Sequence, residues 1–158
     1  MVEQCVPYAR RRYLEMYGYK SGNEPKNDNI FKSINNVIRG WGSSVFGKAK
    51  SDDWWIFDYP VNLSIATFPG PTQYGHVGVI ESGYGWTYVQ GGAAPRLSDS
   101  GIDKAKMSHS NWPEGTKPRT SIIKPMINAD GTVNWKKISI DGGSKYYDVS
   151  AYVAIGPG

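Results

Sequence analysis

The residues of this sequence that could do chemistry are few, and the only cysteine, Cys5, is the first of them. Apolar residues recur after it at spacings of three and four, which predicts a helix from about Gln4 to Tyr17. At the start of a helix, unpaired amide hydrogens and the positive end of the dipole favour a thiolate over a thiol. The same amides could bind a developing oxyanion, with the Gln4 side chain as a second donor. Cys5 is therefore a candidate nucleophile, although a lone cysteine is more often a small buried apolar residue.

A thiol nucleophile needs a base beside it, and the two histidines differ as candidates. His76 begins a predicted strand, 76–82, after a loop that contains Pro and Gly, so it could face a cleft while the strand holds it in place. His109 lies between two serines in a segment that is typical of an exposed loop. The sequence therefore predicts His76 as the base and His109 as an exposed polar residue.

A third residue would hold the imidazole in the correct tautomer. The strand from His76 is separated from a second predicted strand, 86–90, by a Gly-rich turn, which predicts a β-hairpin. In this hairpin His76 lies opposite Gln90 or Gly91, so the Gln90 oxygen could accept a hydrogen bond from one ring nitrogen. Gln90 could equally be an ordinary polar residue at a strand end. Glu81 is about 16 Å away along the strand and on its other face, so it is not expected to orient His76.

The elements that must position these residues are predicted to be two helices followed by a series of strands. The second helix has Asn27 or Asp28 as its cap and ends at Gly40. The predicted strands are 63–68, 76–82, 86–90, 121–126, 133–140 and 146–155. This order predicts an α+β domain in which N-terminal helices pack on a central antiparallel sheet. The turn at 128–131 separates a body, residues 1–126, from residues 127–158, which are expected to form a C-terminal β extension of the same unit.

Length, charge and cysteine content limit the classes of function. The chain has 158 residues, enough for one domain, and no run of about 18 apolar residues that could span a membrane. One cysteine excludes an intrachain disulfide, and two histidines are too few for a structural Cys/His zinc cluster. The net charge of +4 favours anionic surroundings such as a teichoic-acid-bearing wall. No strip of basic residues interleaved with aromatic residues appears, so nucleic acid is not expected as a partner.

Two short motifs resemble those of the CHAP family of cysteine, histidine-dependent amidohydrolases and peptidases, part of the papain-like superfamily. Gln4-Cys5 stands at a predicted helix start, and His76 follows 71 residues later (76 − 5) in the run Gly75-His76-Val77-Gly78-Val79-Ile80-Glu81-Ser82. The segment 122–125 is similar to the closing strand of the family, so the resemblance covers roughly residues 4–126. It implies a papain-like α+β fold and cleavage of peptidoglycan, as in phage endolysins and virion-associated lysins.

The chain departs from the family pattern at the third catalytic position. That position falls on Gln90, where relatives have Glu or Asn, and glycines stand where many relatives have a later Asn. Only four residues precede Cys5, so the acidic calcium loop of some relatives has no counterpart, and no metal or other cofactor is expected. The short N-terminal segment would also suit a fragment of a longer lysin. Tyr74 and Trp86, beside the motif, are expected to line a substrate groove.

Taken together, these features predict a peptidoglycan hydrolase in which Cys5 attacks a carbonyl and His76 transfers the proton. The bond would be a peptide bond of the stem or cross-bridge, cut by an endopeptidase, or the bond cut by an N-acetylmuramoyl-L-alanine amidase. Bacterial peptidoglycan is the expected partner, without membrane insertion, and the protein is expected to be a monomer or part of a longer lysin. No signal peptide is visible, so it would reach the wall by phage release, on a virion or within a larger secreted protein. The alternative is a non-catalytic cell-wall-binding module, for which aromatic loops and basic charge would suffice.

Overall fold

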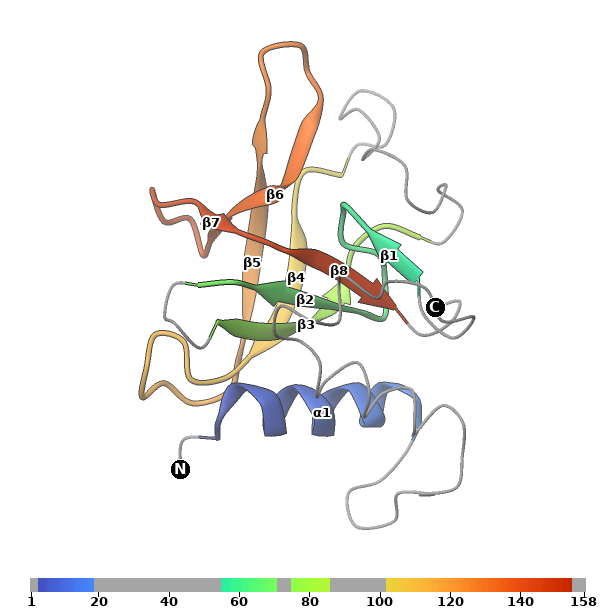
Figure 1. Cartoon of the computed structure of the whole chain (residues 1–158), viewed down its shortest axis with the longest axis vertical. Coiled ribbons are helices and arrows are strands. Elements are labelled where there is room, and N and C mark those ends of the chain that lie inside the picture. The colour runs from blue at the N-terminus through green and yellow to red at the C-terminus, as the bar shows by residue number, and fades with distance from the viewer. Residues whose placement is uncertain (1–2, 19–54, 71–74, 86–101, 155–158) are drawn as a thin grey trace.

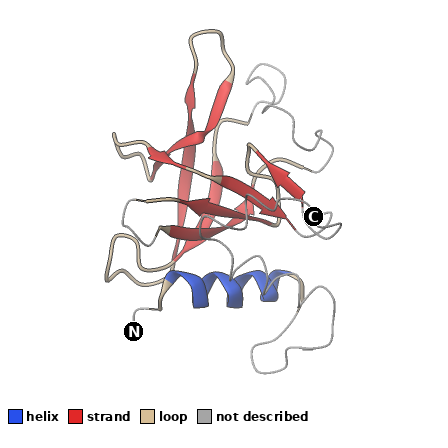
Figure 2. Cartoon of the chain, viewed as in Figure 1, coloured by secondary structure: helices blue, strands red, loops and turns tan. Residues whose placement is uncertain are grey.

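One curled antiparallel β-sheet with a helix packed against it makes up the part of the chain that the computed structural model describes, residues 3–18, 55–70, 75–85 and 102–154 (Figures 1 and 2). The helix is α1 (Cys5–Met16). The eight strands are β1 (Trp55–Phe57), β2 (Ser64–Phe68), β3 (His76–Ser82), β4 (Ala105–His109), β5 (Arg119–Ile127), β6 (Val133–Ile140), β7 (Tyr147–Asp148) and β8 (Ala151–Ala154).

The strands lie in the order β1-β8-β2-β3-β4-β5-β6-β7, and every neighbouring pair is antiparallel. The run from β2 to β7 follows the order of the chain. Only β8 departs from it, because this last strand is inserted between β1 and β2, where Val153 pairs with both Ile56 and Ile65. The sheet curls into a half-barrel, and α1 lies across one side of it (Figure 1).

Helix α1 confirms the sequence prediction for residues 4–17. Pro7 is in its first turn, where a missing amide hydrogen costs nothing. Its buried residues, Tyr8, Ala9, Tyr13 and Leu14, recur at the spacing of one helical face. The helix ends because Gly18 adopts a φ of +87°, which a residue without a Cβ reaches at no steric cost.

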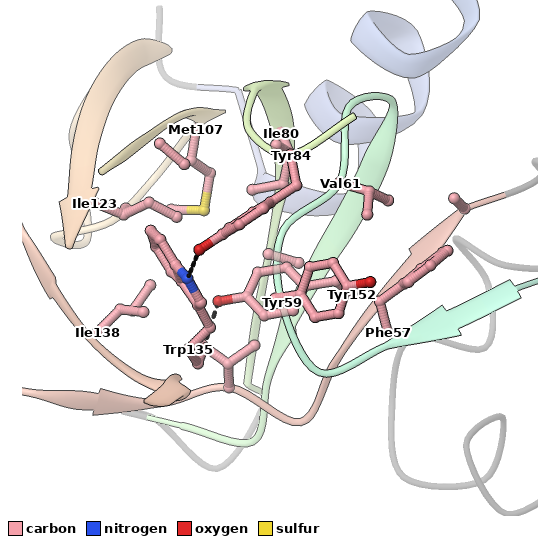
Figure 3. Packing of buried hydrophobic residues seen from close by; sticks show 14 of the residues in the cluster. Phe57, Tyr59, Val61, Ile80, Tyr84, Met107, Ile123, Trp135, Ile138 and Tyr152 are labelled. Atoms are coloured by element: carbon pink, nitrogen blue, oxygen red, sulfur yellow. Dashed lines mark hydrogen bonds between the residues drawn. The ribbon is translucent and has the colours of Figure 1, made fainter. Parts of the chain in front are cut away.

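The central strands send alternate side chains to the two faces of the sheet. Val77 and Val79 of β3 pack under the buried side of α1. Ile80 points the other way, into a larger cluster around Trp135 of β6 (Figure 3). In that cluster Trp135 Nε1 donates to the Tyr84 hydroxyl at 3.0 Å, and the Tyr152 hydroxyl donates to the Trp135 carbonyl at 2.6 Å. The aromatic residues of this cluster therefore pack with their polar groups satisfied.

A charged contact fixes α1 on the sheet. The Arg12 guanidinium donates from both Nε and Nη2 to the Glu81 carboxylate of β3, and the Ser108 hydroxyl of β4 donates to the same carboxylate. A two-pronged Arg–carboxylate contact sets direction as well as distance. Glu81 thus ties helix to sheet on the α1 face, which agrees with its exclusion as a partner of His76.

The predicted papain-like α+β fold is wrong. The described residues are dominated by the eight-stranded sheet and contain one helix, rather than several N-terminal helices packed on a central sheet. Two strands escaped prediction, because β1 is only three residues long and β4 buries polar residues that resemble a loop in the sequence. The predicted strand 146–155 is two strands, β7 and β8. The predicted helix near 27–40 and strand 86–90 lie outside the described residues.

The segment after residue 126 contributes fully to the sheet. β6 pairs with β5, and β8 pairs with both β1 and β2. In the described part of the chain, no helix has the length and apolar character needed to cross a membrane.

Candidate active site

Cys5 is the first residue of α1, and its half-buried side chain lies against the start of β3. The sulfur faces three backbone N–H groups, those of Val77, Val6 and Cys5 itself. Two of these belong to the open end of the helix, as the sequence predicted, and the third belongs to the residue that follows His76. The fold therefore brings the two motifs of the sequence together at one edge of the sheet.

The protonation state of Cys5 differs from the expected one. The three amides lower its pKa, but burial has the larger effect, and the pKa is raised above the usual value for a thiol. At neutral pH the resting group is therefore a thiol rather than a thiolate, so action as a nucleophile would require a base that removes its proton.

His76 is buried at the start of β3, with an exposed fraction of 3 %. Its ring contacts Trp112 at a centroid distance of 4.6 Å and Phe68 of β2 at 5.7 Å. Both neighbours are apolar rings, so the imidazole has little access to water. Burial, with a smaller contribution from the neighbouring His109, lowers the pKa of His76 to about 3.

A chain of hydrogen bonds leads from His76 across three neighbouring strands to the turn after β6. His76 Nε2 lies 3.3 Å from His109 Nδ1, at the end of β4. His109 Nε2 lies 2.8 Å from the Ser121 hydroxyl of β5. The Ser121 hydroxyl donates to Asp141 Oδ2 at 2.7 Å, and Asp141 Oδ1 accepts from the Ile122 N–H at 2.9 Å. We call His76, His109, Ser121 and Asp141 the histidine relay.

The carboxylate at one end of the histidine relay fixes the direction of every bond. Asp141 can only accept, so the Ser121 hydroxyl gives its proton to Asp141 and accepts from His109 Nε2. His109 is then unprotonated at Nδ1 and accepts from His76 Nε2. His76 is in turn unprotonated at Nδ1, so the relay leaves a lone pair on that nitrogen, the state that a general base requires.

Burial also keeps His109 neutral. Its exposed fraction is 0 %, and burial lowers its pKa to about 4, together with the charge of Arg119 and against the opposing charge of Asp141. A neutral His109 can donate from one nitrogen while accepting on the other, as the histidine relay demands. The prediction that His109 is an exposed loop residue is wrong.

The loop between β4 and β5 lies against the start of α1 (Figure 1). The Ser110 hydroxyl donates to the Glu3 carbonyl, and Asn111 Nδ2 donates to Gln4 Oε1 at 2.9 Å. Gln4 is exposed. Its side-chain oxygen accepts from Asn111, so the Nε2 hydrogens are the atoms with which Gln4 could donate to a substrate. This agrees in chemistry with the oxyanion role expected for Gln4, which stays a prediction.

The remaining predicted site residues are not all placed. Gln90, Tyr74 and Trp86 lie outside the described residues, and their roles stay predictions. Gln90 was expected to accept from one ring nitrogen of His76; of the two ring nitrogens, Nε2 is bonded to His109. Among the described residues, no hydrogen bond joins the His76 ring to the Cys5 sulfur, which bonds to the neighbouring Val77 amide.

Sequence reasoning missed three members of the histidine relay, His109, Ser121 and Asp141. His109 carried a usable signal, since apolar Ala105 and Met107 alternate with polar residues up to His109, and Ser121 begins the predicted strand 121–126. The signal for Asp141 was weaker: an Asp followed by Gly142-Gly143 is typical of a turn, which gives no indication of a hydrogen-bonding role. No local pattern shows that these three segments are neighbours in the sheet.

Within the described ranges, no group of three or more His, Cys, Asp or Glu side chains is arranged to hold a metal ion. Each imidazole of the pair already bonds to its neighbour through the ring nitrogen that faces it.

Comparisons of the chain with protein-family models, with curated proteins and with solved structures find no match.

Proposed function

We propose that the protein is a thiol hydrolase that cleaves an amide bond of peptidoglycan, with Cys5 as nucleophile, His76 as base and His109 as the residue that orients His76. One observation carries the proposal: the histidine relay leaves the lone pair of His76 on Nδ1, which has no hydrogen-bond partner among the described residues, and the amide of the next residue, Val77, lies at the Cys5 sulfur. Three members of the relay, His76, His109 and Ser121, are buried, and Asp141 at its end is exposed. A directed chain of three buried polar side chains has no evident role in packing, because apolar residues would fill the same space at lower cost.

The chemistry follows from two neutral groups. The sulfur attacks the amide carbonyl while His76 Nδ1 takes the thiol proton, and the carbonyl oxygen gains the negative charge. The amides of Cys5 and Val6, with Gln4 Nε2, supply donors for that oxygen. The C–N bond then breaks as His76 returns the proton to the leaving amine. Water, deprotonated by His76, cleaves the thioester and restores the thiol.

For the first step the sulfur must leave the Val77 amide and approach His76 Nδ1. The Val77 amide belongs to the residue that follows His76 in β3, so the sulfur lies at the start of the strand that carries the proposed base. Hydrogen bonds between catalytic groups are often long without substrate and shorten when substrate binds. Proton transfer accompanies attack here, because burial holds the thiol and the imidazole in their neutral forms.

The choice of peptidoglycan rests on the Gln4-Cys5 and Gly75–Ser82 motifs and on the net charge of +4, which favours the anionic wall. Purified walls of several bacterial species are therefore the substrate to test, with newly released amino groups as the readout. We expect the wild-type protein to release amines, and Cys5→Ala and His76→Gln to reduce the rate by about a hundredfold or more.

Lys137→Gln is the matched control, since this exposed residue pairs with Asp148 away from the site. Its rate should equal that of the wild type. Release of amines by Cys5→Ala at the parental rate would exclude the proposed mechanism. A wild-type protein that pellets with walls but releases no amines would instead support the wall-binding module.

A further inference from the structure

A pocket of about 240 Å³ lies between the loop after β4 and the turn after β6, and Cys5 is not among the residues that line it. Its lining includes Trp112, Arg119, Lys145, Tyr147 and the two relay residues His109 and Asp141. Pockets for drug-sized molecules have volumes of about 300–1,000 Å³. This one therefore suits a smaller group, of one or two amino-acid residues.

Two aromatic rings form one wall of the pocket. Trp112 and Tyr147 pack edge to face with a centroid distance of 4.6 Å. The Trp112 ring also packs on His76, at the same centroid distance. The wall of the pocket is thus the covering of the proposed base, so a group held there would sit beside the catalytic residues without contacting the sulfur.

The charges at the pocket are mainly positive. Arg119 and Lys145 supply two cations, and Asp141 supplies the one carboxylate. Asp141 is satisfied by closer donors, since its oxygens accept from Ser121 at 2.7 Å and from Ile122 at 2.9 Å. Arg119 stands 3.5 Å from Asp141 and donates once to the Trp112 carbonyl, so most of its donors are left for another acceptor. Lys145 lies over the Tyr147 ring at 5.4 Å, on the rim of the same wall.

We propose that this pocket binds a free carboxylate of a short peptide, with Arg119 and Lys145 as the ligands and Trp112 and Tyr147 as the apolar wall. A planar guanidinium with free donors matches a carboxylate, and an aromatic wall accommodates the small apolar side chains next to it. The assignment of that peptide to the wall substrate rests on the proposed function; the binding itself does not.

The test is an NMR titration of the full-length Cys5→Ala protein, which cannot turn substrate over, with acetyl-D-alanyl-D-alanine and with its C-terminal amide. These probes differ in one charge. We expect saturable shifts of the Trp112 indole signal with the acid, and affinity lower by about tenfold or more for the amide. Arg119→Gln should weaken binding of the acid by about the same factor. Lys145→Gln, at an exposed position, should also weaken it and serves if Arg119→Gln does not fold.

Lys137→Gln is again the control, because it makes the same charge change outside the pocket and should leave the affinity unchanged. Equal affinities for acid and amide, full affinity in both Arg119→Gln and Lys145→Gln, or no saturable binding would overturn the proposal. Because the titration lacks the nucleophile, its result is independent of the wall assay. Amine release from walls without a preference for the acid over the amide would contradict the carboxylate site and support the hydrolase. A preference for the acid without amine release would support the carboxylate site and contradict the hydrolase.

Discussion

The least expected feature at the scale of residues is the position of the negative charge. In the histidine relay the carboxylate does not touch a histidine: Ser121 stands between Asp141 and His109. Each intermediate group accepts one hydrogen bond and donates the next, so the direction of one bond fixes the direction of its neighbour. Asp141 therefore sets the tautomer of His76 through three hydrogen bonds. The histidine relay therefore orients the His76 ring while the charged carboxylate of Asp141 stays out of contact with it.

Asp141→Asn should reverse the histidine relay. The Ile122 amide keeps the Asn oxygen as its acceptor, so the Asn nitrogen must donate to Ser121. Ser121 then donates to His109 Nε2, and His109 donates to His76, whose remaining proton moves to Nδ1. We expect wall hydrolysis to fall by about a hundredfold while the protein stays folded, because the base has lost its lone pair. The ¹⁵N shifts of labelled histidine rings report the tautomers directly.

The backbone at residue 141 has a φ of +51°, and Asn tolerates this conformation well, so the substitution adds little strain. Asp148→Asn, at an exposed partner of Lys137, is the matched control and should change neither activity nor tautomer. An Asp141→Asn protein with the parental ¹⁵N pattern would show that Asp141 does not direct the relay.

Candidate catalytic residues could be predicted from the sequence only where the local context was informative. Cys5 stood before a periodic helix, and His76 opened a strand, so both were identified as candidates and lie at one edge of the sheet. His109 was assigned to a loop because Lys106 and two serines surround it. Those serines are buried because Ser108 binds Glu81 and Ser110 binds Glu3. Such long-range partners leave no trace in the local sequence.

Among the described elements, the chain before β2 and the chain after β3 cross in close backbone contact. Tyr84 N–H donates to the Pro60 carbonyl, and Asn62 N–H donates to the Tyr84 carbonyl, each at 2.8 Å. Gly83 lies in this crossing, and its N–H donates to Asn62 Oδ1 at 2.7 Å. A Cβ at residue 83 would lie 2.4 Å from the Pro60 oxygen, so only glycine fits.

Gly83→Ala should lower the free energy of unfolding by about 3 kcal/mol, since backbone rather than a mobile side chain has to move. Urea denaturation measures the loss. Gly115→Ala is the comparison, because its Cβ meets no atom within 4 Å, so it carries only the cost of a positive φ, about 1 kcal/mol. Equal losses for the two variants would show that the crossing relaxes freely.

Element prediction succeeded where apolar alternation was strong. The segment 133–140 was predicted as a strand with the bounds that the structure gives, and 121–126 lies within β5. The predicted hairpin of 76–82 with 86–90 is a different case: β3 has β2 and β4 as its neighbours in the sheet, while 86–90 lies outside the described residues. A Gly-rich turn indicates that the chain bends, but not which strand becomes the partner.

At the scale of the whole molecule, the two buried imidazoles make folding sensitive to acid. Both are neutral in the folded state, with pKa values lowered to about 3 for His76 and about 4 for His109. In the unfolded chain each binds a proton near pH 6.5. Below that pH the unfolded state therefore holds more protons, and stability falls as the pH falls.

Between pH 6.5 and 5 the loss should approach about 1.4 kcal/mol per pH unit for each imidazole, with little change above pH 7. Carboxylates such as Glu81, with its pKa lowered first by Arg12, titrate below this window and do not contribute. Urea midpoints measured across the window test the expectation, and His109→Gln should reduce the slope by about half. A wild-type slope near zero would mean that the imidazoles are charged in the folded protein.

The overall fold was the least predictable level. The resemblance led to a papain-like arrangement of helices on a sheet, whereas the described chain is a curled sheet that carries one helix. The order of strands depends on which edges meet, and β8 illustrates this, because nothing in 151–154 indicates a place between β1 and β2. Alternation fixes the faces of a strand but leaves its neighbours open.

The place of β8 has a consequence for biosynthesis. A ribosome synthesises this strand after the other seven described strands, yet β1 and β2 meet only through it. Until it emerges, the nascent chain exposes the edges of both strands and lacks Val153 and Ala151 beneath the helix that carries Cys5. A protein assembled in this order would hold the helix that carries Cys5 in a fixed position only after β8 has been synthesised.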